Sequence, residues 1–435
     1  MNKKVQNAWA MYDWANSTYN LVIGTAIFPI FYSEVTKGDR DGAPGDSVLF
    51  FGHIFKNTEV LSYCLAFGMA IVCLLTPALA GVADYLGRKR FFLKVFCYLG
   101  ALSCASLFFF DVEHLEWSML SIVLACVGFW CSYAFYNSFL PEVAPSEDQD
   151  KLSARGFAFG YIGSVLLLVM NLVAIKVFGM PAKWSFVSVC IWWIGFAQYT
   201  FRHLPEKPRS ESLQANMLKK GFSELGKVWS EMKQAGELKG YLISFFVFSM
   251  GVQTIMQMAS LFGTKEIVRI DESGQQVIGL ESGQLIVAVL LVQLIAIPGS
   301  IVFGRVSGKW GNMTTLKVAL FVWMLVCLYA YFLVHTPLDF FIAAGGIGFI
   351  MGGTQSLARS TYSKLLPKTH DHASYFSFYD VTEKVGLIIG LLSFGFIEGT
   401  FGSMRASILA LITFFALGLL LLMRVRNDKA STPSH

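Results

Sequence analysis

Ionisable and amide side chains lie within long apolar runs of this sequence, where they could bind a polar solute. A charge at the centre of a bilayer costs about 2.5–3.5 kcal/mol, so such residues are candidates for a transport pathway. In the first run, Asp13, Asn16, Asn20 and Gly24 recur at i, i+3, i+7 and i+11, on one helix face. We interpret this stripe as cavity lining. The alternative is an interfacial aromatic belt with a hydrated Asp13 at the helix entrance.

Later apolar runs also carry polar residues four positions apart, which places them on one face of a helix. These runs supply the further cavity candidates Tyr133, Tyr136, Asn137, Gln253, Gln257, Gln355, Arg359, Tyr379, Glu383 and Lys384. For any single glutamine, a hydrogen bond that bridges two helices explains the residue equally well. Asp380 and Lys384 could form an i, i+4 ion pair that locks one conformation. Alternatively, this region contacts a solute or a coupling proton.

The short segment GVADYLGRKR, residues 81–90, joins two apolar runs and has the residues of a gate. Gly81 and Gly87 allow a tight turn and close helix approach. Arg88 and the two cations after it resist translocation, which predicts a cytoplasmic loop. Asp84 can accept hydrogen bonds from Arg88 or from a helix N-terminus. A second loop, residues 304–311, keeps glycines and cations but has Gly308 where the acid would stand.

Long apolar helices must position these residues, since 55% of the 435 residues are hydrophobic and only 14% are charged. Soluble domains have about 25% charged residues. Runs of about 20 apolar residues predict twelve membrane spans. We place them at 9–35, 58–80, 91–110, 116–139, 156–178, 184–201, 240–263, 282–304, 315–334, 338–358, 376–397 and 406–423.

The charge distribution predicts the orientation of these spans. Alternate assignment puts 26 of the 34 Lys and Arg residues on the side of residues 81–90, so both termini are expected in the cytoplasm. The net charge of +5 follows this topology and gives no indication of nucleic-acid binding.

The largest polar break divides the spans six and six. We predict an N-terminal six-helix bundle (1–201), a cytoplasmic linker with an amphipathic helix (202–239) and a C-terminal six-helix bundle (240–435). The linker helix could lie on the membrane surface or pack on the bundle ends. Of the two long outward segments, 37–57 and 265–282, the second contains the IVRI, DESG and QQVI pattern of a short β-hairpin.

Four stretches resemble the vacuole-effluxer-like branch of the major facilitator superfamily, and the resemblance covers nearly the whole chain. They are YDWANSTY (12–19), NSFLP (137–141), GVQTIMQMASLFG (251–263) and GGTQSLARSTYSKLLP (352–367). The branch includes fungal vacuolar amino-acid effluxers linked to autophagy. By this resemblance, the branch's characteristic polar positions are Asp13, Asn16, Gln253, Gln355, Arg359 and Lys384.

We therefore expect an all-α membrane protein with twelve transmembrane helices in two pseudo-symmetric bundles. It would be a monomeric secondary transporter of the cytoplasmic membrane, moving a small polar solute such as an amino acid, with efflux favoured, by alternating access. The alternative is a non-transporting membrane receptor or scaffold. ATP-driven transport by this chain alone is not expected, because the sequence shows no Walker loop. An enzyme is not expected, because the sequence shows no catalytic Ser/His arrangement and no metal-spaced cluster. We expect no catalytic residue, no cofactor and no metal.

Overall fold

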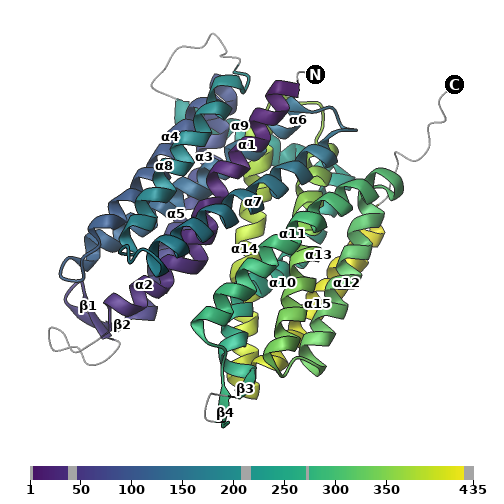
Figure 1. Ribbon diagram of the computed structural model, residues 1–435. Helices are drawn as coiled ribbons and strands as arrows, with labels where there is room; N and C mark the ends of the chain where they lie inside the picture. Colours follow the sequence, from purple (N-terminus) through teal and green to yellow (C-terminus); the bar gives the residue numbers. More distant parts are fainter. Residues whose placement is uncertain (1–2, 38–46, 207–216, 271–273, 426–435) are drawn as a thin grey trace. The chain divides into compact units, whose positions relative to one another are not determined.

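The computed structural model describes residues 3–37, 47–206, 217–270 and 274–425. These residues are helical apart from two short hairpins (Figure 1). The first half contains α1 (Lys3–Thr18), η1 (Tyr19–Ala26), α2 (Ile27–Val35), α3 (Asn57–Leu86), α4 (Lys89–Ser106), η2 (Leu107–Phe109), α5 (Leu115–Asn137), α6 (Leu140–Val143), α7 (Gln149–Lys176) and α8 (Lys183–His203). The second half contains α9 (Met217–Gln234), α10 (Gly236–Glu266), α11 (Ser282–Trp310), α12 (Asn312–Phe332), α13 (Pro337–Leu365), α14 (His372–Phe401) and α15 (Met404–Arg424).

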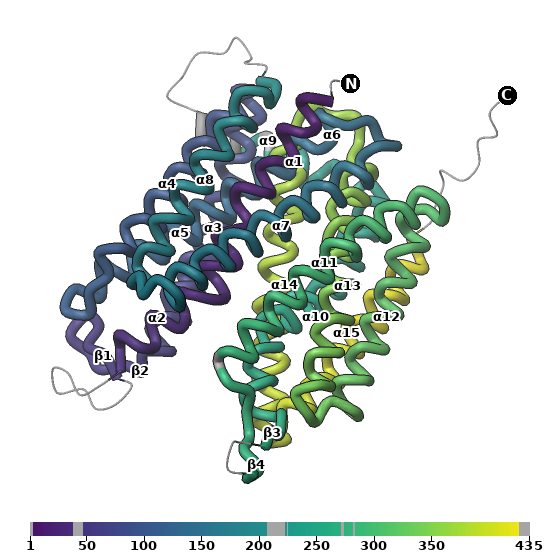
Figure 2. Tube along the Cα trace, viewed as in Figure 1, coloured from purple at the N-terminus to yellow at the C-terminus, as the bar shows by residue number. Residues whose placement is uncertain are grey.

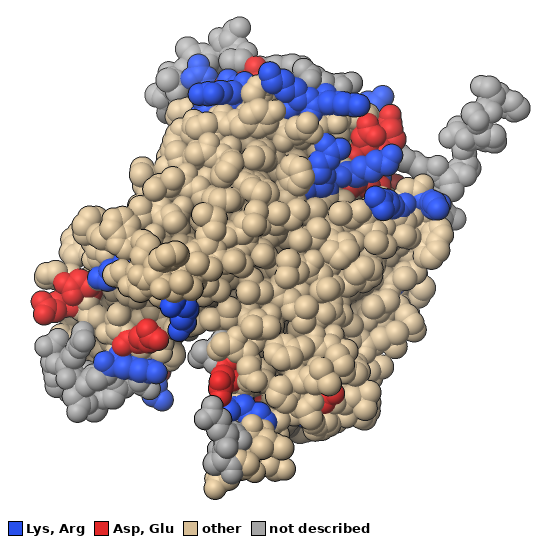
Figure 3. All heavy atoms as spheres, viewed as in Figure 1, with Lys and Arg blue, Asp and Glu red and all other residues tan. Residues whose placement is uncertain are grey.

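The helices are those of a multi-pass membrane protein. Among the described residues, ten are long and apolar enough to cross a bilayer. The two remaining expected spans fall on the continuous run α1–η1–α2 and on α8. On the face shown in Figure 3, Lys and Arg gather toward the top and the bottom of the view, and the described surface between them is largely without charge. Lipid tails can cover such a surface without stripping water from charges.

The helices form two compact units, each with its own internal packing. Unit 1 comprises Met1–Val143, Phe159–Gly226 and His370–Ser377, and unit 2 comprises Ala144–Ala158, Lys227–Thr369 and Phe378–His435. In unit 1, α4 packs on α5 and α8, and α1 packs on α8; in unit 2, α11 packs on α13, and α15 on α10 and α12 (Figure 2). Thus α7 begins in unit 2 and continues in unit 1, and α14 does the reverse.

Small residues allow the tightest helix contacts in both units. A Cβ added to Gly128 of α5 would lie 2.3 Å from the backbone of Gly100 in α4. In unit 2, a Cβ on Gly352 of α13 would lie 2.2 Å from the Ala296 carbonyl oxygen of α11. Such close approach is typical of membrane helices, whose association depends on van der Waals packing at small residues.

The junction expected as a loop over residues 81–90 is much shorter than predicted. Helix α3 continues through Leu86, so Gly81 and Asp84 are helical. Gly87 ends the helix in the left-handed conformation (φ 66°), and α4 begins at Lys89. The tight turn at Gly87 is therefore confirmed, but the loop boundary was placed too early. The residues before Gly87 are mostly apolar and buried, which favours continuation of the helix.

Two hairpins lie in the long segments between spans. The predicted hairpin is confirmed, because β3 (Val268–Ile270) pairs antiparallel with β4 (Gln276–Ile278). Residues 271–273 of its turn lie outside the described chain. A second hairpin, β1 (Ser47–Phe50) with β2 (His53–Lys56), was not predicted. It turns at Phe51 and Gly52, both with positive φ (47° and 76°), the pattern of a type I′ turn.

The predicted linker helix is present as α9, although residues 207–216 of the linker are outside the description. Val228 and Met232 are buried, and the Trp229 ring lies 5.4 Å from that of Phe378 in α14. For this part of α9, these contacts favour the alternative in which the helix packs on a bundle end.

Candidate solute pathway and gate contacts

The first span is interrupted by a π-helical segment, η1, between two α-helical parts. π-Helical turns are rare and often occur at functional sites. Here the interruption turns Asn20, Gly24 and Thr25 outward, while the residues directly around Asn20 are buried. The Thr25 hydroxyl donates a 2.9 Å hydrogen bond to the Asn20 carbonyl. Unit 1 therefore presents an amide, a hydroxyl and an uncovered backbone in the middle of an apolar span.

Asp13 precedes this segment and is almost fully buried, with 3% of its surface exposed. Its Oδ2 accepts a 2.8 Å hydrogen bond from the Tyr136 hydroxyl of α5. The Tyr136 ring stacks on fully buried Trp9, whose indole donates to the Tyr136 carbonyl. The alternative of a hydrated Asp13 within an interfacial aromatic belt is therefore wrong.

The other unit 1 candidates are neighbours of this pair along the chain. Asn16 is buried, and its Nδ2 has no hydrogen-bond partner among the described residues. Asn137 is also buried. Tyr133 is half-buried, and its ring lies 6.0 Å from that of Tyr136. The structure thus brings Asp13, Tyr133 and Tyr136 together. The unsatisfied amide of Asn16 follows Asp13 in the chain, one helical turn later.

In unit 2, the polar stripes of α10 and α14 meet. Gln253 Nε2 donates a 2.7 Å hydrogen bond to Glu383 Oε1. Lys384 Nζ lies 2.7 Å from Asp380 Oδ1 and 3.0 Å from Glu383 Oε2. The Tyr379 ring stacks on Phe245 of α10, with 4.2 Å between centroids. The expected i, i+4 pair is present, extended by a second acid and an amide.

Two other unit 2 candidates remain accessible on the helix surface. Gln257, one turn after Gln253, is exposed. Gln355 of α13 is half-buried and donates to the Met256 sulfur at 3.2 Å. Both amides could still contact a solute.

Arg359 has a different environment from the one its sequence spacing suggested. The side chain is 1% exposed, and its nitrogens donate to the Ser153 hydroxyl and carbonyl, both at 3.0 Å. The guanidinium also lies 4.2 Å from the Phe157 ring centroid. These contacts join α13 to the start of α7, so Arg359 stabilises a helix contact within unit 2.

Asp84 accepts hydrogen bonds from a helix N-terminus, one of the two partners that its position suggested. Its carboxylate oxygens accept from the backbone N–H groups of Ala373 (3.2 Å) and Ser374 (2.7 Å), in the first turn of α14. Anions are stabilised there by the helix dipole and the unpaired N–H groups. Beside it, Glu142 accepts from Lys89 and lies 3.1 Å from His372.

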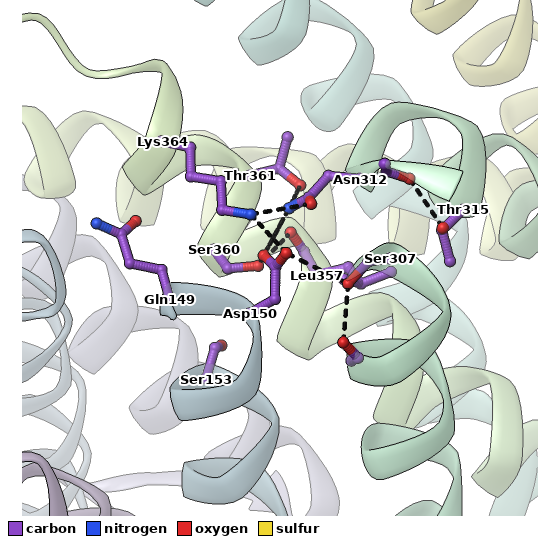
Figure 4. A network of polar contacts seen from close by, with 12 residues as sticks. Gln149, Asp150, Ser153, Ser307, Asn312, Thr315, Leu357, Ser360, Thr361 and Lys364 are labelled. Atoms are coloured by element: carbon purple, nitrogen blue, oxygen red, sulfur yellow. Dashed lines mark hydrogen bonds and ion pairs between the residues drawn. The ribbon is translucent and has the colours of Figure 1, made fainter. Parts of the chain in front are cut away.

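Unit 2 contains a related contact, shown in Figure 4. Asp150, in the first turn of α7, pairs with Lys364 and accepts from Asn312 (2.7 Å) and Ser307 (3.3 Å). Ser307 follows Gly304 by three residues, as Asp84 follows Gly81. By this spacing, Ser307 and not Gly308 is the counterpart of Asp84. In unit 1 the acid of the contact is Asp84 of α3, whereas in unit 2 the acid is Asp150 of α7.

Comparison with known proteins decides the family. A family model described as "Vacuole effluxer Atg22 like" matches residues 1–434. The chain belongs to this family. It is 30% identical to the uncharacterised MFS-type transporter YxiO of Bacillus subtilis, over 99% of this chain and 97% of that protein. Autophagy-related protein 22-1 of Penicillium rubens is 21% identical, covering 92% of this chain and 80% of the fungal protein.

Solved structures show the fold. The E. coli fucose:proton symporter FucP superposes with a TM-score of 0.66 and 13% identity, covering 98% of each chain. The proton:xylose symporter XylE gives a TM-score of 0.69 at 12% identity, covering 98% of this chain and 96% of its own. The chain is thus an all-α membrane protein with the major facilitator fold, and its relatives are transporters.

Proposed function

We propose that this protein is a secondary active transporter that moves a small polar solute of the amino-acid class across the cytoplasmic membrane. Transport itself is the activity of the family. The outward direction follows the effluxer description of that family. The amino-acid class rests on the sequence resemblance described above, and both are narrower proposals than transport itself.

The observation that carries the proposal is the polar face exposed in the middle of η1. An amide that faced lipid would lose its hydrogen bonds to water and gain no others. An amide that faces a water-filled path keeps those bonds and can exchange water for solute. Asn20 and Thr25 therefore line the path in unit 1. Gln253, Gln257 and Glu383 supply the complementary amides and carboxylate in unit 2.

Alternating access would come from rocking of the bundle 1–201 against the bundle 240–435. The Asp84 contact with the start of α14, which lies within unit 1, supports a gating role for this end of the helices. The excess of Lys and Arg on this side supports a cytoplasmic location for the gate and for both termini.

A thermal-shift screen of purified protein against amino acids, dipeptides and sugars tests the solute class. A ligand at 100 times its Kd stabilises the folded protein by about 2.7 kcal/mol, which is readily measured as a rise in Tm. We expect one or more amino acids to raise the Tm of the wild type and not that of Asn20→Ala. The matched control is Asn312→Ala, which removes an amide from the Asp150 network instead. Stabilisation by sugars alone would contradict the amino-acid class.

A further inference from the structure

The buried ion cluster of α14 contains one more acid than base. Asp380 and Glu383 both contact the single ammonium group of Lys384. The Asp380 and Lys384 side chains are each 3% exposed, and that of Glu383 is 16% exposed. With all three groups ionised, two carboxylates and one ammonium leave a single uncompensated negative charge. Buried charges without compensation are costly, so the cluster favours the gain of one cation.

The helices packed around this cluster in unit 2 do not supply that cation. Among the described residues, the ion pairs of Asp380 and Glu383 are both made with Lys384, whose Nζ lies 2.7 Å from Asp380 Oδ1 and 3.0 Å from Glu383 Oε2. Helix α10 offers the neutral amide of Gln253. Helix α13 offers the Tyr362 ring, which lies 4.8 Å from the ring of Tyr379.

One oxygen of the cluster shows what kind of cation fits. Asp380 Oδ2 is enclosed by protein and has no hydrogen-bond partner among the described residues. An unsatisfied buried acceptor costs about 1–3 kcal/mol, and more when it is charged. A metal ion or an amine would need room and further oxygen ligands beside this atom. A proton needs neither, and it removes the excess charge at the same time.

We propose that Asp380 and Glu383 share one exchangeable proton, and that this is the coupling proton of the transporter. The proton is assigned to the pair because both carboxylates contact the same ammonium group. Asp13 is less suited to this role, because the Tyr136 hydroxyl already donates to its Oδ2. The coupling part rests on the proposed function, whereas the binding of a proton can be measured without any solute.

The test is infrared difference spectroscopy of purified protein in detergent between about pH 8 and about pH 5, followed at the protonated-carboxyl band. We expect the wild type to gain one protonated carboxyl group that both Asp380→Asn and Glu383→Gln lose. Glu398→Gln is the matched control: it removes an acid from the same helix that pairs with Lys265 near the surface. This control should keep the signal of the cluster.

A third variant should strengthen proton binding instead of removing it. Lys384→Gln keeps both acids but removes the ammonium group that repels a proton, so proton affinity should rise tenfold or more. Spectra of Asp380→Asn, Glu383→Gln and Lys384→Gln that all equal the wild type would overturn the proton site. Transport that persists in proteoliposomes with unchanged pH dependence in Glu383→Gln would overturn the coupling role alone. Absence of transport in the wild type, with a normal carboxyl signal, would instead count against the proposed function.

Discussion

Replacement of Asp84 by Asn should loosen the start of α14 by an amount that the geometry allows us to estimate. The carboxylate is 2% exposed and accepts two backbone hydrogen bonds. Hydrogen bonds to a charged group contribute about 1.5–3 kcal/mol, and an anion at a partly buried helix N-terminus up to about 2 kcal/mol. Asn keeps one acceptor oxygen but places an NH₂ donor against an N–H donor. We therefore expect a loss of about 2–3 kcal/mol, which is a 30- to 150-fold shift in the equilibrium of this contact.

Cysteine accessibility measures this shift. Ser377 of α14 is fully buried near the contact, so Ser377→Cys reports its opening. In inverted membrane vesicles, a reagent that does not cross membranes should label this cysteine 30- to 150-fold faster when Asp84→Asn is present. The parent with its native cysteines gives the background.

Asp339→Asn is the matched control for this experiment, because Asp339 also accepts hydrogen bonds at a helix N-terminus but is only half-buried. Asp339→Asn should leave the labelling rate of Ser377→Cys within twofold of the rate in the protein that carries Ser377→Cys alone. Equal labelling rates with and without Asp84→Asn would refute the role of this carboxylate in holding the contact.

Three further predictions concern other parts of the chain. Asp13→Asn should abolish solute transport, or change its pH dependence, with little loss of folded protein, whereas a variant that transports as the wild type does would leave Asp13 as a packing residue. Arg359→Lys should lower the free energy of unfolding by roughly 2–3 kcal/mol, because lysine lacks the planar fork that bonds Ser153 and lies over Phe157. Thermal unfolding checks this, with Arg305→Lys at an exposed site on α11 as the control. Arg88→Cys should resist an impermeant thiol reagent added to intact cells, and labelling from outside would contradict the proposed topology.

Helix positions were predictable from the sequence, because they depend on local periodicity. The stripe of Asp13, Asn16 and Asn20 was expected on one helix face, but Asp13 and Asn16 are buried and only Asn20 is exposed. The hairpin of β3 and β4 was predictable from β-branched residues around a glycine-containing turn. The hairpin of β1 and β2 was missed, although the pattern SVLF–FG–HIFK has the alternation and the glycine that such a hairpin needs.

Partners distant in the chain could not be predicted in the same way. The hydrogen bond from Tyr136 to Asp13 joins residues 123 positions apart, and the Lys364 pair with Asp150 spans 214. Arg359 shares a sequence spacing with Gln355, yet its rotamer directs it to Ser153 of α7. The π-helical segment was also missed, since an i+5 hydrogen-bond pattern has no fixed residue signature in a membrane span.

Solute counterflow in proteoliposomes tests the central claim most directly. Liposomes that contain purified protein and a high internal concentration of unlabelled amino acids are diluted into a trace of labelled amino-acid mixture. We expect transient accumulation of label in the wild type and at least a tenfold lower initial rate in Asn20→Ala and in Gln253→Ala. Normal counterflow in both variants would contradict the assignment of η1 and α10 as the solute path, and absence of counterflow in the folded wild-type protein would contradict transport of this solute class.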